Sequence, residues 1–247
     1  MTRLPHARML CGAALALSLT GCLSAPGTDD TRQRAIEFVQ GRPGAEGLMF
    51  RLPPGFRPVA RGVLPGGMPF QTYLPAGEPE RSRRRFLEVI ITPAAVLSAR
   101  GVVTPQQILL MTAVGMRDQT CPRTFNASML GPIRSALGPR NAPAPRPDAP
   151  DFAAILGCGR TPNGGSEVTL MVALRDRGDL FLLSWQERGA VRDRGPVPID
   201  EALWLSRLRQ LQPLRLCAAA TGASGPAPDC VLQAADPIPE GPGATRP

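Results

Sequence analysis

Residues 167–187 constrain the fold of this chain more than any other stretch. Large apolar side chains occupy every second position of its first half, at Val168, Leu170, Val172 and Leu174. The polar run 175–178 then supplies a turn that ends in glycine, and residues 180–185 return as a second apolar strand. Alternation with a period of two on both sides of a short turn is typical of a β-hairpin. The chain is therefore expected to build an antiparallel sheet around this hairpin.

Further strands are predicted by short runs of β-branched and aromatic residues between turn signals. They cover residues 48–52, 68–74, 86–92, 125–133 and 151–158. The runs 68–74 and 86–92 are expected to pair as a second hairpin, joined by the loop 75–85. Five prolines in residues 138–150 predict an extended loop, because proline cannot donate to a sheet ladder.

Two helices are predicted by capping residues that precede apolar positions at helical spacing. Thr104, Pro105 and Gln107 have the pattern of a capping box with proline at the first helical position. The buried face expected after them consists of four apolar residues, Ile108, Leu110, Met111 and Val114. Asp200 is expected to cap a second helix, whose apolar stripe is Leu203, Trp204, Leu208 and Leu211.

This order of elements predicts an α+β domain. Strands, a helix, more strands, a hairpin and a last helix favour an antiparallel sheet of about five or six strands with two helices covering one face. The domain is expected to span residues 46–217. A flexible tether precedes it at residues 22–45, with a short helix at 30–40, and a disordered tail rich in Ala, Gly and Pro follows at 218–247.

Residues 1–21 have the build of an export signal. Arg3 and Arg8 form a basic start, and residues 9–19 follow as an apolar run without charge. As a helix this run would be roughly 16 Å long, about half of a bilayer core. A permanent membrane span is therefore not expected there.

The signal ends in Leu19-Thr20-Gly21-Cys22, an aliphatic residue and two small residues before a cysteine. This motif resembles the lipobox of bacterial lipoproteins, and the resemblance is confined to residues 1–22. It implies that Cys22 receives a diacylglycerol, that the chain is cut before it, and that fatty acids such as palmitate hold the protein at a membrane. Leu23, in place of aspartate, favours the outer membrane on its periplasmic side. The alternative is an ordinary secretory signal with a chance cysteine.

Four cysteines remain once Cys11 leaves with the signal and Cys22 takes lipid: Cys121, Cys158, Cys217 and Cys230. An even number in an oxidising compartment indicates disulfides. Three pairings are open, of which Cys121–Cys158 with Cys217–Cys230 is favoured. A metal site is the alternative, but the cysteines lack the close paired spacing of zinc sites. No metal or other cofactor is therefore predicted.

Two missing residue types exclude much catalytic chemistry. His6 is the only histidine and falls in the signal, and the chain has no lysine. Serine and cysteine hydrolases that need an imidazole base are excluded, as are Schiff-base and phosphate-loop lysines. A carboxylate pair remains chemically open, with Glu88, Glu167, Asp179 and Glu187 as candidates. Nothing in the sequence selects two of these as partners, so we expect a protein that is not an enzyme.

The sharpest candidate for a binding site is the cluster Arg81, Arg83, Arg84 and Arg85 in the loop 75–85. Guanidinium groups can fork onto phosphate or carboxylate, so the cluster predicts an anionic lipid, a glycan or an acidic protein as partner. The alternative is a solvated loop, since every cation of the domain is an arginine. Nucleic acid is not expected as a partner, because basic and aromatic residues are not interleaved.

These observations predict a membrane-anchored envelope lipoprotein. Its domain is expected to be a binding or scaffold module for an envelope protein, and the alternative is an anion-binding or small-ligand-binding lipoprotein that uses the arginine loop. Trp185 and Trp204 are expected to pack against each other between sheet and helix instead of forming a ligand platform. The motifs of the domain match no characterised family.

Overall fold

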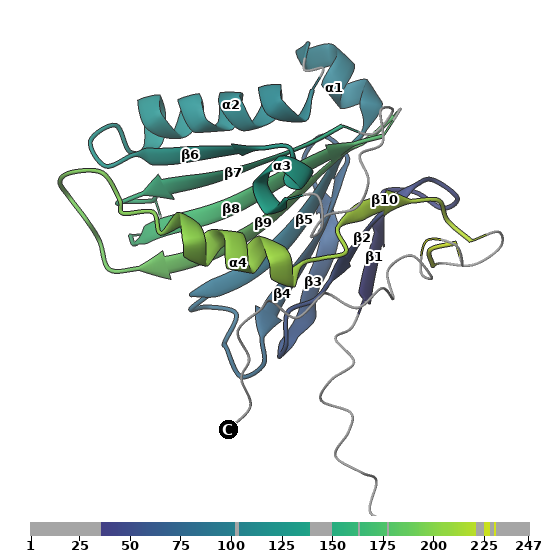
Figure 1. Ribbon diagram of the computed structural model, residues 1–247, viewed down its shortest axis with the longest axis horizontal. Helices are drawn as coiled ribbons and strands as arrows, with labels where there is room; N and C mark the ends of the chain where they lie inside the picture. Colours follow the sequence, from purple (N-terminus) through teal and green to yellow (C-terminus); the bar gives the residue numbers. More distant parts are fainter. Residues whose placement is uncertain are drawn as a thin grey trace, which may run out of the picture. The chain divides into compact units, whose positions relative to one another are not determined.

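The computed structural model describes residues 36–101, 104–138, 150–162, 164–176, 178–220, 225–227 and 230. They form an α+β fold with two antiparallel sheets, which confirms the predicted fold class (Figure 1). The larger sheet has seven strands in the order β3-β4-β5-β9-β8-β7-β6. Their bounds are β3 Phe56–Leu64, β4 Met68–Pro75, β5 Arg85–Thr92, β6 Asn126–Gly131, β7 Asp151–Cys158, β8 Ser166–Arg175 and β9 Leu180–Gly189. The predicted signal, Cys22 and most of the tether lie outside the described residues.

Both predicted hairpins are confirmed. Strands β8 and β9 pair from Ser166↔Gly189 to Arg175↔Leu180, and β4 pairs with β5. No strand is predicted for residues 56–64, yet β3 forms there at the edge of the sheet. Its register shifts between Pro58 and Ala60, and a proline is tolerated at such an edge because its missing N–H faces no partner strand.

A smaller sheet of three strands has the order β1-β2-β10. Strands β1 (Ile36–Gln40) and β2 (Gly47–Arg51) form a hairpin, and β10 (Arg215–Cys217) pairs with the other edge of β2. The helix predicted for residues 30–40 is therefore wrong over 36–40, where the chain is a strand. A short isolated helix is marginal in water, whereas β1 gains a full ladder with β2 and buries Val39.

The central strands of the large sheet are apolar on both faces, and a helix covers each face. One face presents Leu170, Val172 and Leu183 to the main core, which also holds α4 (Glu201–Gln210). The other face presents Met171 and Ala173 to α2 (Pro105–Gly115) and α1 (Ala94–Arg100). The expected placement of both helices on one face is wrong. In these strands the residues that face one side and the residues that face the other are both apolar, which indicates a strand that is buried on both sides.

The start of α2 is confirmed, but only Ile108 of its predicted buried face packs against the core. The Thr104 hydroxyl accepts from the Gln107 N–H and the Gln107 side chain accepts from the Thr104 N–H, which completes the capping box. Leu109 and Ala113 of α2 are buried in the sheet-side cluster, and Ile108 packs against it partly buried. Leu110, Met111 and Val114 are exposed, at 42%, 56% and 46%. With apolar residues on every side of residues 108–114, spacing alone could not fix which side meets the sheet.

Helix α4 begins as predicted, because the Asp200 carboxylate accepts from the Leu203 N–H over 3.0 Å. Trp204, Leu208 and Leu211 are buried in the main core, whereas Leu203 is 39% exposed. Trp185 lies in the same core. Among the described residues its ring partner is Phe56, at 5.6 Å between ring centroids, and Trp204 belongs to the same buried core between sheet and helix.

The four domain cysteines lie at disulfide distance in the favoured pairs. The Cα atoms are 5.6 Å apart in Cys121–Cys158 and 6.0 Å apart in Cys217–Cys230. The first pair joins the π-helical turn after α2 (Met116–Thr120) to the end of β7. The second pair joins β10 to the segment after it.

Three other features complete the fold. Ile133, predicted to end a strand, begins the short helix α3 (Ile133–Leu137), because Pro132 ends the β6 ladder. Most of the predicted loop 138–150 lies outside the described residues. Within the part of the chain that the structure describes, no helix is long and apolar enough to span a membrane.

Candidate functional site

The loop between β4 and β5, residues 76–84, is held by its own polar groups. The Glu78 carboxylate accepts hydrogen bonds from the backbone N–H groups of Arg84 and Arg85, the latter at 3.0 Å. Arg83 has φ of 31°, in the left-handed region that residues other than glycine rarely adopt. The loop therefore has a defined shape that fixes where its arginines start.

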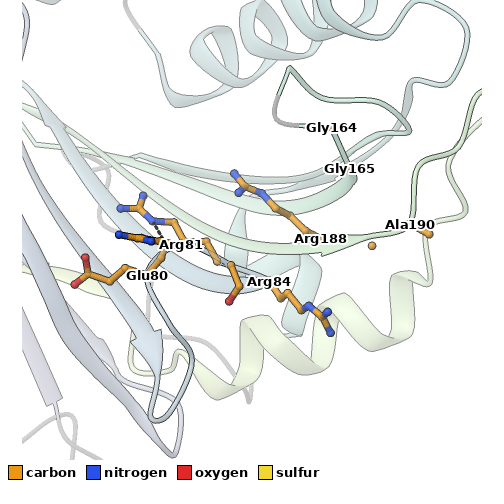
Figure 2. A pocket seen from close by; sticks show the side chains of 10 residues that line it. Glu80, Arg81, Arg84, Gly164, Gly165, Arg188 and Ala190 are labelled. Atoms are coloured by element: carbon orange, nitrogen blue, oxygen red, sulfur yellow. Dashed lines mark hydrogen bonds between the residues drawn. The ribbon is translucent and has the colours of Figure 1, made fainter.

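This loop forms part of the wall of a hollow of about 800 Å³ (Figure 2). The rest of the wall comes from the β7–β8 turn, at Gly164 and Gly165, and from the end of β9. The charged residues that line it are one acid and four arginines, namely Glu80, Arg81, Arg83, Arg84 and Arg188. Such an excess of positive charge in a concave surface attracts anions.

The arginines surround this hollow without converging on one point. In Figure 2 the guanidinium groups of Arg84 and Arg188 point in opposite directions, and Arg81 lies beside Glu80. Arg83 donates from Nε to the backbone carbonyl of Glu80 over 3.2 Å. The hollow therefore concentrates positive charge without presenting one point that all four guanidinium groups share.

Arg188 is the lining residue that sequence reasoning missed. It is far from the arginine cluster in sequence, but the β5–β9 pairing brings it to the loop, where its N–H donates to the Arg84 carbonyl over 2.7 Å. Its side chain lies over the Phe86 ring, with 5.0 Å from Cζ to the ring centroid, and donates to Glu167 over 2.9 Å. The only signal for it in the sequence was the predicted sheet, whose strand order was unknown.

Arg85, a predicted member of the cluster, does not line the hollow. It begins β5 opposite Glu187, on the side of the sheet that α4 covers. Glu187 itself accepts from Arg207 over 3.1 Å, and Arg207 lies over the Trp185 ring at 5.0 Å. The structure therefore brings three of the four predicted arginines together and leaves the fourth apart.

The four candidate acids do not form one site. Glu88 and Glu167 are on the same face of the sheet, on β5 and β8. Asp179 is at the turn end of β9, where it accepts from the Ala94 N–H over 3.3 Å, and Glu187 is on the opposite face. Within the described residues, no group of three or more Cys, Asp or Glu side chains is arranged to hold a metal ion.

Glu88 belongs to a row of polar side chains in the middle of the sheet. Its Oε1 accepts from the Thr72 hydroxyl over 3.1 Å, and its backbone carbonyl accepts from Ser184 over 3.5 Å. Burial raises the pKa of Glu88, and the negative charge of Glu167 adds to that effect. The Thr72 hydrogen bond and the positive charge of Arg83 offset part of this shift in pKa.

We expect Glu88→Gln to raise the stability of the protein at pH 7. Because the folded state raises the pKa of Glu88, it binds a proton more tightly than the unfolded chain, so the free energy of unfolding falls as pH rises past the ordinary glutamate pKa. Glutamine keeps the acceptor for Thr72 but carries no charge, so the free energy of unfolding no longer falls with pH through this group. The variant is expected to gain on the order of 1 kcal/mol in the free energy of unfolding at pH 7. Urea unfolding at pH 4 and pH 7, followed by circular dichroism, measures it.

The exposed Glu80 is the matched control for this experiment. Glu80→Gln is expected to keep the pH dependence of the wild-type protein, because no buried charge is removed. An equal gain at pH 4 and pH 7 in Glu88→Gln would contradict the prediction, since it would show that the carboxylate charge has no part in the effect.

Comparison with known proteins identifies no family. No family model matches the sequence, and no curated protein matches it. Among solved structures, the chain is similar to LpqN of Mycobacterium tuberculosis, which is described as involved in cell envelope biogenesis. The match covers 76% of this chain and 95% of that one, at 13% identity and a TM-score of 0.33. The candidate site is therefore interpreted from its own geometry.

Proposed function

We propose that this protein is a lipid-anchored binding module of the bacterial cell envelope, and that the arginine hollow binds an anionic group. The observation that carries the proposal is the hollow itself, where four arginines from two distant parts of the chain outnumber one glutamate. Guanidinium groups offer several fixed N–H donors to phosphate or carboxylate oxygens. A half-enclosed site strengthens such bonds because it holds less competing water.

Two observations support the proposed location in the cell envelope. The first is Leu19-Thr20-Gly21-Cys22 at the end of an apolar run, with attachment through Cys22 and the outer membrane, facing the periplasm, as the favoured location. The second is the pairing of all four domain cysteines at disulfide distance, which fits an oxidising compartment.

A binding role rather than an enzymatic one is supported by the chemistry of the hollow. The arginines that line it stay protonated at neutral pH and cannot act as a general base. Glu167, a carboxylate next to the hollow, is already bonded to Arg188 over 2.9 Å. These groups can hold and orient an anion.

A protein-binding or scaffold role is the second candidate, and the exposed apolar side of α2 favours it. Leu110, Met111 and Val114 form a continuous strip on the outer side of that helix. A defined envelope protein that binds the wild-type chain stoichiometrically, and fails to bind Met111→Asp, would support this role.

We expect the triple substitution Arg81→Gln, Arg83→Gln and Arg84→Gln to weaken anion binding by about tenfold or more. Each guanidinium contributes a charge-assisted hydrogen bond or a favourable long-range field, and the losses combine to at least about 1.4 kcal/mol. The measurement is calorimetric titration of the full chain, in non-ionic detergent at low salt, with ethyl phosphate as the probe.

Arg85→Gln is the control, because it removes one of the adjacent positive charges without touching the hollow. Its affinity for ethyl phosphate is expected to stay within about twofold of wild type. Equal losses in the triple variant and in Arg85→Gln would show that general charge, and not the hollow, attracts the anion.

A further inference from the structure

Glu88 is a half-buried carboxylate that forms no salt bridge among the described residues, although the positive charge of Arg83 acts on it from a longer distance. Within the described part of the chain no arginine lies within ion-pair distance of it, and its one side-chain hydrogen bond comes from the neutral hydroxyl of Thr72. That hydroxyl engages Oε1. Burying a charge in this way is unfavourable unless something pairs with it.

The arginine hollow begins one step along the same face of the sheet. Phe86 and Glu88 are alternate residues of β5, so their side chains leave the same face and are separated by roughly 6–7 Å along the strand. The guanidinium of Arg188 lies over the Phe86 ring, at 5.0 Å from its centroid. The Arg188 guanidinium, which also pairs with Glu167, is thus separated from the Glu88 row by about two residues of strand.

The surrounding residues hold the Glu88 backbone in place. Ser184 lies opposite Glu88 in the β5–β9 register, and its hydroxyl donates to the Glu88 carbonyl over 3.5 Å. Gln186 in turn donates to the Ser184 hydroxyl over 3.1 Å. Thr72 and Ser184 are themselves almost fully buried, so the row is part of the rigid sheet and not of the loop.

We propose that the hollow and Glu88 together bind a zwitterion, with its anionic phosphate on the arginines and its ammonium group on Glu88. The proposal rests on the proposed function, since it assigns the anion to the same hollow. A phosphate and an ammonium joined by two carbons span several ångströms, which matches the step from the Phe86 row to the Glu88 row. The ligand class is therefore a phosphoethanolamine, either as a lipid headgroup or as a free compound.

An ammonium group fits Glu88 better than a divalent metal ion or a neutral hydroxyl does. One carboxylate with a threonine hydroxyl offers too few ligands for a divalent metal ion. A neutral hydroxyl would hydrogen-bond to Glu88 but would leave its charge unbalanced. An ammonium supplies both the donor and the opposite charge, and such charge-assisted bonds are about twice as strong as neutral ones.

The test compares O-phosphoethanolamine with ethyl phosphate, which has the same phosphate and carbon chain but no amine. Both are titrated into the full-length protein in non-ionic detergent. We expect phosphoethanolamine to bind at least about tenfold more tightly to the wild-type protein. Glu88→Gln is expected to abolish this preference while ethyl phosphate affinity stays within about twofold of wild type.

Glu80→Gln serves as the control for loss of a negative charge at the hollow, and it is expected to keep the preference. Equal binding of the two probes, or a preference that persists in Glu88→Gln, overturns the zwitterion proposal but leaves the anion site intact. Absence of binding by either probe overturns both. Circular dichroism checks that Glu88→Gln retains the fold. Thr72→Val removes the hydroxyl that orients Glu88, and it is expected to lower the preference for phosphoethanolamine partway.

The source of the headgroup is decided with two phosphodiesters, glycerophosphoethanolamine and lysophosphatidylethanolamine below its micelle concentration. They share phosphate and ammonium groups and differ in one acyl chain. Tighter binding of the lysolipid that depends on Glu88 supports a membrane lipid as ligand, and equal Glu88-dependent binding supports a free compound. Binding of both that does not depend on Glu88 contradicts the assignment of the ammonium.

Discussion

A Cys22→Ala variant is expected to carry no fatty acid and either to leave the membrane fraction or to remain an uncut precursor. The reason is that the lipobox resemblance makes the Cys22 sulfur the attachment point. Each buried methylene of an acyl chain contributes about 0.8 kcal/mol, and two or three chains make the attachment lasting. Metabolic labelling with palmitate, followed by fractionation of the envelope, measures both effects.

Cys11→Ala is the matched control, because Cys11 lies in the apolar run 9–19, which is predicted to be cut away before Cys22. Labelling and membrane attachment are expected to be unchanged in that variant. Full palmitate labelling of Cys22→Ala would refute the lipobox, and the protein would then have an ordinary secretory signal.

Gly159→Ala is expected to lower the free energy of unfolding by about 3 kcal/mol, at the upper end of what overpacking costs. A Cβ on Gly159 would come within 2.5 Å of the Arg192 carbonyl oxygen and 2.7 Å of Thr124 Cβ. Neither neighbour can withdraw easily, because the Arg192 N–H donates to the Gly159 carbonyl over 2.8 Å and the Thr124 hydroxyl accepts from the Gly159 N–H over 3.0 Å.

Chemical denaturation of the full chain measures this loss, and Gly115→Ala is its control. Gly115 lies at the end of α2 with no atom within 4 Å of an added Cβ. Alanine there should stabilise the protein by about 0.5–1 kcal/mol, because it improves helix propensity without a clash. A Gly159→Ala protein as stable as wild type would show that the segment next to Cys158 can shift.

Local sequence signals predicted the parts of the fold that local chemistry decides. The β8–β9 hairpin and the Thr104 and Asp200 caps depend on neighbours within a few residues, and all three are confirmed. The buried face of α2 depends instead on how the helix lies on Met171 and Ala173, which are distant in sequence. Residues 36–40 became a strand because they pair with β2 in a hairpin, and β2 also pairs with β10 near the end of the domain.

The candidate site shows the same division. The arginine cluster at residues 81–85 was visible in the sequence because its members are adjacent. Arg188 was not, because it joins the hollow only through the β5–β9 pairing. Arg85 does not line the hollow with the other three, because strand alternation turns its side chain to the face opposite from Phe86. The proposed role of Glu88 beside this hollow could likewise be inferred only from the strand order.

The pairing of β2 with β10 determines when the small sheet can form as the chain is made and folded. Met49 and Cys217 lie side by side although 168 positions separate them, and Leu214 and Leu216 complete the main core. A chain that is synthesised from its N-terminus cannot close this sheet until Cys217 has emerged. An exported chain would therefore complete its fold only after nearly the whole domain had crossed the membrane. Strands β1 and β2 would cross before β10 could pair with them.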